Sequence, residues 1–144
     1  MIYNLTEMSR VCGIPINFLF SRGQQIKVAS MIYRKAKQYD YLIPNKKTEH
    51  MGEKYEGAIV IEPKRGYYLE PIATLDFASL YPSIMMAHNL CYTTHVPHYL
   101  AKKYKRGSEI EQTPNGDYFI KEDVKRGILP MILEELIAER HKTR

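Results

Sequence analysis

The residue types best suited to chemistry lie in one short run near the middle of the sequence. The run is Asp76-Phe-Ala-Ser-Leu-Tyr-Pro-Ser-Ile84. A hard divalent cation such as Mg²⁺ binds carboxylates, carbonyls and substrate phosphates, so the Asp76 carboxylate and the Phe77 backbone carbonyl could share one ion. If the chain then turns into a helix, the N–H groups of Ser79, Leu80 and Tyr81 could hold triphosphate oxygens. The run therefore indicates one half of a metal-dependent nucleotide site.

The same run has a simpler structural explanation, which spacing alone favours. Asp76 could cap the helix that follows, while Tyr81 and Ile84 pack in the core. In addition, one carboxylate cannot neutralise two divalent cations, so a two-metal site needs a second carboxylate from elsewhere. The residue types by themselves leave both interpretations open.

The elements that must position this run are predicted from apolar patterning. Three short apolar runs before it are punctuated by Gly and Pro, which is typical of strands; they are Gly57–Ile61, Gly66–Glu70 and Pro71–Leu75. The third leads directly into Asp76, which a strand would hold rigidly. A helical pattern follows from about Leu80 to near Asn89, so the run is expected between a strand and a helix.

Further elements are predicted on either side. They are a helix from Ser21 to Tyr39, a polar loop from Ile43 to His50, a hairpin at Thr113–Asp117 and an amphipathic helix from Pro130 to about His141. Ser21 and Gln24 have the spacing of a capping box. Pro130 is expected in the first turn of the last helix, where a missing N–H costs nothing. Helices with mostly antiparallel strands indicate an α+β fold.

Composition narrows the class of protein without identifying a partner. The chain has 144 residues, enough for one core, and 21 Lys and Arg against 16 Asp and Glu give a net charge of +5. That excess favours an anionic partner such as nucleic acid, but a solvated basic surface explains it as well. Two separated cysteines, Cys12 and Cys91, indicate a reduced intracellular protein. No apolar run approaches the roughly 20 residues of a membrane span, so we expect no membrane partner.

The run at Asp76 resembles the first palm motif of the B-family DNA polymerases, Asp-x-x-Ser-Leu-Tyr-Pro-Ser-Ile. Its continuation over residues 85–94 narrows the resemblance to the delta branch of that family. Four further segments are similar to stretches of the same family: Ser21–Gln25 after the exonuclease domain, Tyr55–Ala58 between exonuclease and palm, and both Pro114–Asp117 and Lys125–Pro130 before the fingers. The resemblance covers nearly the whole chain. Ala58 and Ala78 depart from the commonest residues at their positions, but neither change removes a metal ligand.

The resemblance implies a role for each residue of the run. Asp76 would bind both catalytic Mg²⁺ ions, and the Phe77 carbonyl would bind the nucleotide-carrying one. The N–H groups of Ser79 and Leu80 would hold the β- and γ-phosphates of a dNTP, while Tyr81 would be the steric gate against a ribose 2′-OH. The reaction would be attack of a primer 3′-hydroxyl on the α-phosphate. The template strand would contact Tyr55, Gly57 and Ala58.

The resemblance also implies how the chain is organised. Residues 1–50 would form a mainly helical exonuclease–palm junction, residues 51–120 the first half of the palm, and residues 121–144 the start of the fingers helix. The sequence lacks the other catalytic aspartates, the proofreading exonuclease motifs and the cysteine clusters that could hold an iron–sulfur cluster. We therefore expect a fragment, inactive alone, of a nuclear replicative polymerase. Its partners would be primer–template DNA, dNTP, accessory subunits and a sliding clamp.

Three alternatives stay open beside this interpretation. They are a viral or protist polymerase of delta-like sequence, a catalytically inactive DNA-binding scaffold of the same family, and an α+β hydrolase with a lone Asp. An intact Asp76 and Tyr81 favour an active enzyme, because a scaffold needs neither a metal ligand nor a sugar gate.

The remaining polar residues are expected to have structural roles. Cys91, His95 and His98 lack the fourth member of a closed zinc site. Asn89 is expected to tie its helix to neighbouring backbone, and His88 to be a hydrogen-bonded packing residue. Two basic groups are expected to be solvated or to complement a helix end; they are Lys102, Lys103, Lys105 and Arg106, and Arg140, Lys142 and Arg144.

Overall fold

The computed structural model describes residues 2–43 and 57–143. The chain divides into two compact units, which are described separately. The first contains Met1–Ile43 and Ser79–Arg144, and the second is Pro44–Ala78. Nearly all of the predicted loop from Ile43 to His50, and the candidate template residue Tyr55, lie outside the described residues.

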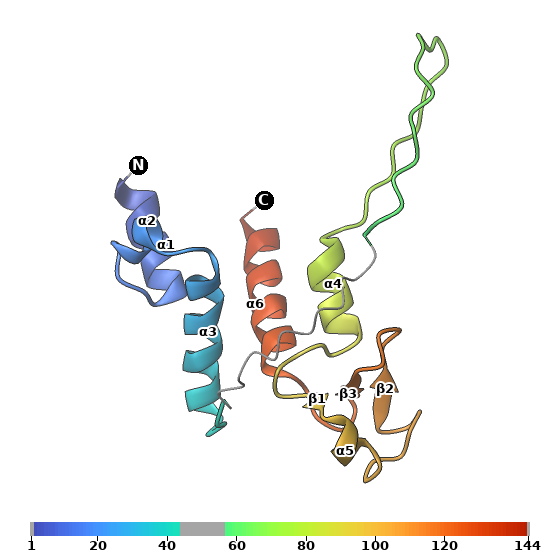
Figure 1. The fold of residues 1–144 in the computed structure, drawn as a ribbon. Helices are drawn as coiled ribbons and strands as arrows, with labels where there is room; N and C mark the ends of the chain where they lie inside the picture. Colours follow the sequence, from blue (N-terminus) through green and yellow to red (C-terminus); the bar gives the residue numbers. More distant parts are fainter. Residues whose placement is uncertain (1, 44–56, 144) are drawn as a thin grey trace. The chain divides into compact units, whose positions relative to one another are not determined.

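Helices form one side of the first unit (Figure 1). They are α1 (Ile2–Cys12), α2 (Phe18–Ser21), α3 (Gln25–Gln38), α4 (Leu80–Ala87) and α6 (Ile128–Lys142). The α6 helix packs against both α3 and α4, with α3 and α4 on opposite sides of it. The core between α3 and α6 contains the buried side chains of Ile32, Ala36, Ile128 and Ile132, together with Cys91. The helix predicted over the last segment is confirmed, and Pro130 lies in its first turn.

A small antiparallel sheet completes the first unit. It contains β1 (His95–Val96), β2 (Ile110–Gln112) and β3 (Tyr118–Ile120) in the order β1-β3-β2, with the short helix α5 (His98–Ala101) after β1. The predicted hairpin is confirmed, because β2 and β3 pair around a turn in which Thr113 N–H donates to Asp117 O at 2.8 Å. Gly116 has φ +94° in this turn, a conformation that suits a residue without Cβ. Helices with an antiparallel sheet give the expected α+β class.

The helix predicted from Ser21 is shorter at its start than expected. The α3 helix begins at Gln25, and Ser21 instead ends α2, where its Oγ donates to Asn17 O at 2.8 Å. Arg22 is extended at φ −118° and ψ 152°, and this break separates the two helices. The capping-box prediction is therefore wrong, because Ser21 lies on the far side of the break.

The three strands predicted before Asp76 are also wrong, because none of the described residues 57–78 lies in a strand. Every one of these residues is exposed; Ile59 is 92%, Leu69 86% and Leu75 93% exposed. A strand is stabilised by hydrogen bonds and side-chain contacts to a neighbouring strand. Short apolar runs without such a neighbour do not produce a sheet.

Among the described residues, no helix is both long enough and apolar enough to cross a bilayer.

Candidate nucleotide-binding turn

The start of α4 has an unusual backbone. Ser79, the residue just before the helix, has φ 53° and ψ 57°, which is the left-handed region. Its carbonyl accepts the first helical hydrogen bond, from Ser83 N–H at 2.9 Å. A residue with a Cβ pays about 1–2 kcal/mol for this conformation. Strain of this kind is common where a backbone must present its groups to a ligand. We call residues Ser79–Tyr81 the candidate turn.

The candidate turn has N–H groups available to an acceptor. The first N–H groups of any helix lack acceptors within that helix. In the described part of the chain, the N–H groups of Ser79, Leu80 and Tyr81 have no acceptor. Pro82 follows in the first turn, where its missing N–H removes no helical hydrogen bond. These three N–H groups and the positive end of the helix dipole favour an anion.

A guanidinium lies at the same turn. Arg140, near the end of α6, donates from Nη2 to Ser79 Oγ at 2.8 Å. The interpretation that Arg140 only complements the end of its own helix therefore missed this contact. No local pattern could have indicated it, because the two residues are 61 positions apart and meet only when α6 packs against α4. The turn thus combines helix N–H groups with a planar cation suited to phosphate.

The simpler structural explanation of the run disagrees with the structure. Tyr81 is 75% and Ile84 42% exposed, so neither side chain is in the core. The residue at the cap position of α4 is Ser79 and not Asp76.

Asp76 and Phe77 belong to the second unit, and both are exposed there, as are Gly57 and Ala58. The Asp76 carboxylate and the Phe77 carbonyl are hard oxygen donors, which fit Mg²⁺ in type. They are too few for a complete metal site. Among the described residues, no group of three or more His, Cys, Asp or Glu side chains could hold a metal ion.

The sulfur and imidazole groups considered for zinc have separate partners. Cys91 Sγ accepts hydrogen bonds from Thr93 Oγ1 at 3.2 Å and from Leu129 N–H at 3.3 Å. His95 Nε2 lies 3.6 Å from Asp117 Oδ1, and the His98 ring meets the Tyr118 ring edge-on at 5.5 Å. His88, which is not among the zinc candidates, has its Nδ1 3.2 Å from Glu111 Oε1, and its side chain is 52% exposed.

The expected structural role of Asn89 is confirmed. Its side chain is 1% exposed, and Nδ2 donates to Ile120 O at 2.7 Å and to Lys125 O at 2.8 Å. Its Oδ1 accepts from Gly127 N–H at 2.7 Å. Asn89 therefore joins the end of α4 to the end of β3 and to the start of α6. This clamp helps to fix the two helices that bring Ser79 and Arg140 together.

Comparisons with known proteins agree with the resemblance of the run. The DNA polymerase delta catalytic subunit of Candida albicans is 56% identical over 144 aligned residues, which cover 99% of this chain and 14% of that protein. The subunit of the same name from Oryza sativa subsp. japonica is 57% identical over 145 residues, covering 99% of this chain and 13% of that protein. The one from Dictyostelium discoideum is 56% identical over 145 residues, covering 100% and 13%.

The chain thus spans only 13–14% of the length of these curated relatives. The sequence pattern of DNA polymerase family B matches residues 14–144, which is most of the chain and includes the whole run at Asp76. This chain belongs to DNA polymerase family B.

Proposed function

We propose that this chain contributes half of the catalytic site of a replicative DNA-directed DNA polymerase. The reaction is template-directed transfer of a nucleotide from dNTP to a primer 3′-hydroxyl. The observation that carries the proposal is the candidate turn: free N–H groups at the start of α4 and the Arg140 guanidinium converge at Ser79. Membership of DNA polymerase family B supplies the chemistry for which such a turn is suited.

The phosphates of the incoming nucleotide bind at this turn. The backbone N–H groups of Ser79 and Leu80 donate to the β- and γ-phosphate oxygens, and Arg140 adds charge-assisted donors beside them. Because these groups are fixed by helix packing, they need little reorganisation when the triphosphate binds.

Asp76 and the Phe77 carbonyl are the groups that would hold Mg²⁺. When bound, the two ions activate the primer hydroxyl and neutralise the triphosphate. Since one carboxylate is insufficient, the second comes from a part of the protein outside this sequence. The isolated 144 residues are therefore expected not to extend a primer.

Tyr81 selects the sugar. Its ring is 75% exposed and follows directly after the phosphate-binding N–H groups, so it is available to contact a sugar next to bound phosphates. A ring packed against C2′ would exclude a 2′-hydroxyl and favour deoxyribonucleotides. Gly57 and Ala58 are exposed small residues, which suits close approach of a template backbone, and Tyr55 would contact the same strand.

The wider organisation follows the family. Residues 1–50 form the exonuclease–palm junction, residues 51–120 the first half of the palm and residues 121–144 the start of the fingers. In the whole protein, a proofreading 3′–5′ exonuclease, an iron–sulfur cluster, accessory subunits, a sliding clamp and a nuclear location are expected.

The test uses the full-length protein that carries this segment. Asp76→Ala should abolish primer extension with Mg²⁺ and leave primer–template affinity within about twofold, since the carboxylate contacts metal and not DNA. Asp123→Asn is the matched control, because Asp123 is exposed and has no ion pair among the described residues. Full extension by Asp76→Ala would rule out the proposed site. Absence of extension by the unmodified full-length protein would favour the inactive scaffold.

A further inference from the structure

One stretch of the first unit carries positive charge that no acidic side chain balances. It contains Lys102, Lys103, Lys105 and Arg106, all exposed, which we call the basic segment. Within the described part of the chain, none of these four side chains has an ion-pair partner. Other basic side chains there do have partners: Arg10 pairs with Glu7, Lys35 with Glu135, Arg126 with Glu122 and Lys142 with Glu139.

Glu109 has the carboxylate nearest to the basic segment in the sequence, but that carboxylate binds backbone and not a basic side chain. Glu109 Oε2 accepts a hydrogen bond from the Lys105 backbone N–H at 2.8 Å and so closes the loop between α5 and β2. The loop is also fixed by Lys121, whose Nζ donates to Gly107 O at 2.6 Å. Side chains of Glu109 and Lys121 therefore hold the backbone of this loop, while the charged groups of the basic segment remain available to bind an anion.

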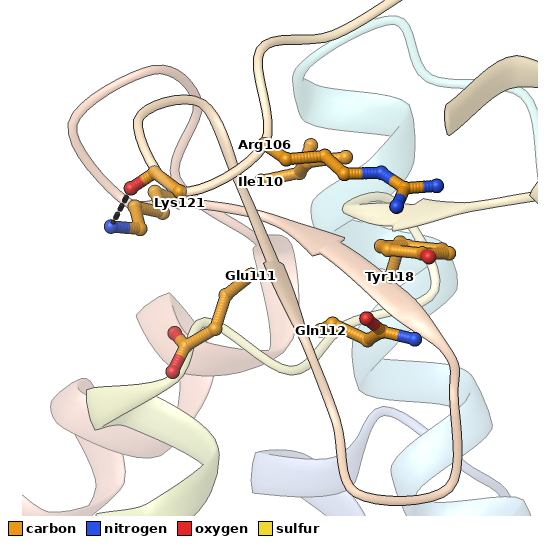
Figure 2. Close-up of a pocket in the computed structure, with 7 residues that line it drawn as sticks. Arg106, Ile110, Glu111, Gln112, Tyr118 and Lys121 are labelled. Carbon is orange, nitrogen blue, oxygen red and sulfur yellow. Dashed lines mark hydrogen bonds between the residues drawn. The ribbon is translucent and has the colours of Figure 1, made fainter. Parts of the chain in front are cut away.

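Two tyrosines accompany these charges. Tyr99, on α5 and three residues before Lys102, is 76% exposed. The Arg106 guanidinium lies over the Tyr118 ring, 5.3 Å from its centre, as Figure 2 shows. Arg106, Tyr118, Gln112 and Lys121 line one hollow of about 330 Å³; Glu111 also borders it, with its carboxylate 3.2 Å from His88 Nδ1. That volume is near the lower limit of ligand pockets, roughly 300 Å³, and suits a single base or phosphate. An Arg stacked on a ring keeps its edge N–H groups free for an anion.

We propose that the basic segment, Tyr99 and this hollow bind single-stranded nucleic acid. Lysine and arginine side chains would contact successive phosphates, and the exposed Tyr99 ring would stack on an unpaired base. A duplex offers the same phosphates, but its bases are already stacked and leave no use for Tyr99. The inference rests on the proposed function in one respect only. That function identifies the nucleic acid as DNA, since a DNA polymerase meets single-stranded template.

The experiment measures the affinity of the full-length protein for a fluorescent single strand of about 16 nucleotides, the upper range for one binding surface. It is done in EDTA without dNTP, over a salt series. The lysine variant is Lys102→Gln/Lys103→Gln/Lys105→Gln. Its matched control, Arg10→Gln/Arg22→Gln/Lys37→Gln, removes the same charge from exposed positions on α1, on α3 and in the break between α2 and α3.

If all three lysines contact phosphate, the lysine variant should lower the slope of log affinity against log salt by about 2, at about 0.7 per contact. Affinity at low salt should fall about tenfold, with little change in the control. Tyr99→Ala should weaken the single strand at least about fivefold and leave a blunt duplex unchanged.

Equal losses in the lysine variant and its control would overturn the proposal, as would an unchanged salt slope. Equal weakening of single strand and blunt duplex by Tyr99→Ala would overturn the single-strand assignment. Because binding is measured without metal, Asp76→Ala should leave it intact. A failure of the catalytic proposal therefore shows in primer extension alone, and a failure of this one in the metal-free binding measurements alone.

Discussion

The hydrogen bond between Arg140 and Ser79 should control nucleotide affinity. Ser79→Ala in the full-length protein removes the acceptor at 2.8 Å and leaves Arg140 free to rotate. A hydrogen bond to a charged group is worth about 1.5–3 kcal/mol, and the exposure of Arg140 places this one at the lower end. Since each 1.4 kcal/mol is tenfold, KM for dNTP should rise by up to about tenfold with kcat little changed.

Ser79→Gly separates the hydroxyl from the backbone strain. Glycine adopts φ 53° without the cost that Ser79 and Ala bear, so the turn itself should be more stable in this variant. If the hydroxyl matters because it holds Arg140, Gly and Ala should raise KM to a similar extent. If Ser79→Gly keeps the KM of the unmodified protein, the hydroxyl has no role in nucleotide binding and the reasoning is refuted.

A double-mutant cycle gives the decisive measurement. Arg140→Ala should raise KM by more than Ser79→Ala, about tenfold or more, because it also removes the donors to phosphate. Ser79→Ala/Arg140→Ala should then be no worse than Arg140→Ala alone, since the hydroxyl acts only through the guanidinium. Steady-state extension of a primer at varied dNTP gives both constants. Additive effects would mean that the two residues act independently, contrary to the geometry.

Three further predictions concern α4 and the residues that join it to α6. Tyr81→Ala in the full-length protein should mainly increase incorporation of ribonucleotides relative to deoxyribonucleotides; unchanged sugar selectivity would disprove the gate. Asn89→Ala should lower the free energy of unfolding by about 3–5 kcal/mol, measured by denaturant titration, because it leaves the Ile120 and Lys125 carbonyls and the Gly127 N–H without their buried partner. Gly127→Ala should also destabilise the protein, by about 1–3 kcal/mol, because a Cβ there would lie 2.7 Å from Cys91 Cβ and 3.0 Å from Asn89 Oδ1.

Features set by neighbouring residues could be predicted from the sequence. The hairpin depends on a turn at Asn115 and Gly116, and α6 on its own periodicity and on Pro130 near its start. The pattern that follows the run at Asp76 likewise predicts a helix from about Leu80, and α4 begins at that residue. Asn89 was correctly identified as a link to backbone, because a polar side chain at a helix end needs acceptors nearby.

Features set by distant residues could not be predicted in the same way. The short apolar segments before Asp76 are bounded by Gly and Pro like strands, but a strand requires a partner that local sequence does not specify. Capping-box spacing at Ser21 was misleading, because the extended Arg22 ends the preceding helix first. The left-handed Ser79 and its contact to Arg140 depend on how α6 lies against α4, and spacing carries no trace of that packing.

The clamp at Asn89 and the contact at Ser79 explain together how a strained turn can be kept. Left-handed Ser79 costs about 1–2 kcal/mol, and nothing in its own side chain offsets that cost by capping α4. Packing of α4 against α6 can offset it, since Asn89 fixes one end of α4 to the start of α6 and Arg140 meets the other end. Strain at the candidate turn therefore depends on buried bonds at the far end of the same helix. Loosening Asn89 should release the turn, and nucleotide affinity should fall before the fold is lost.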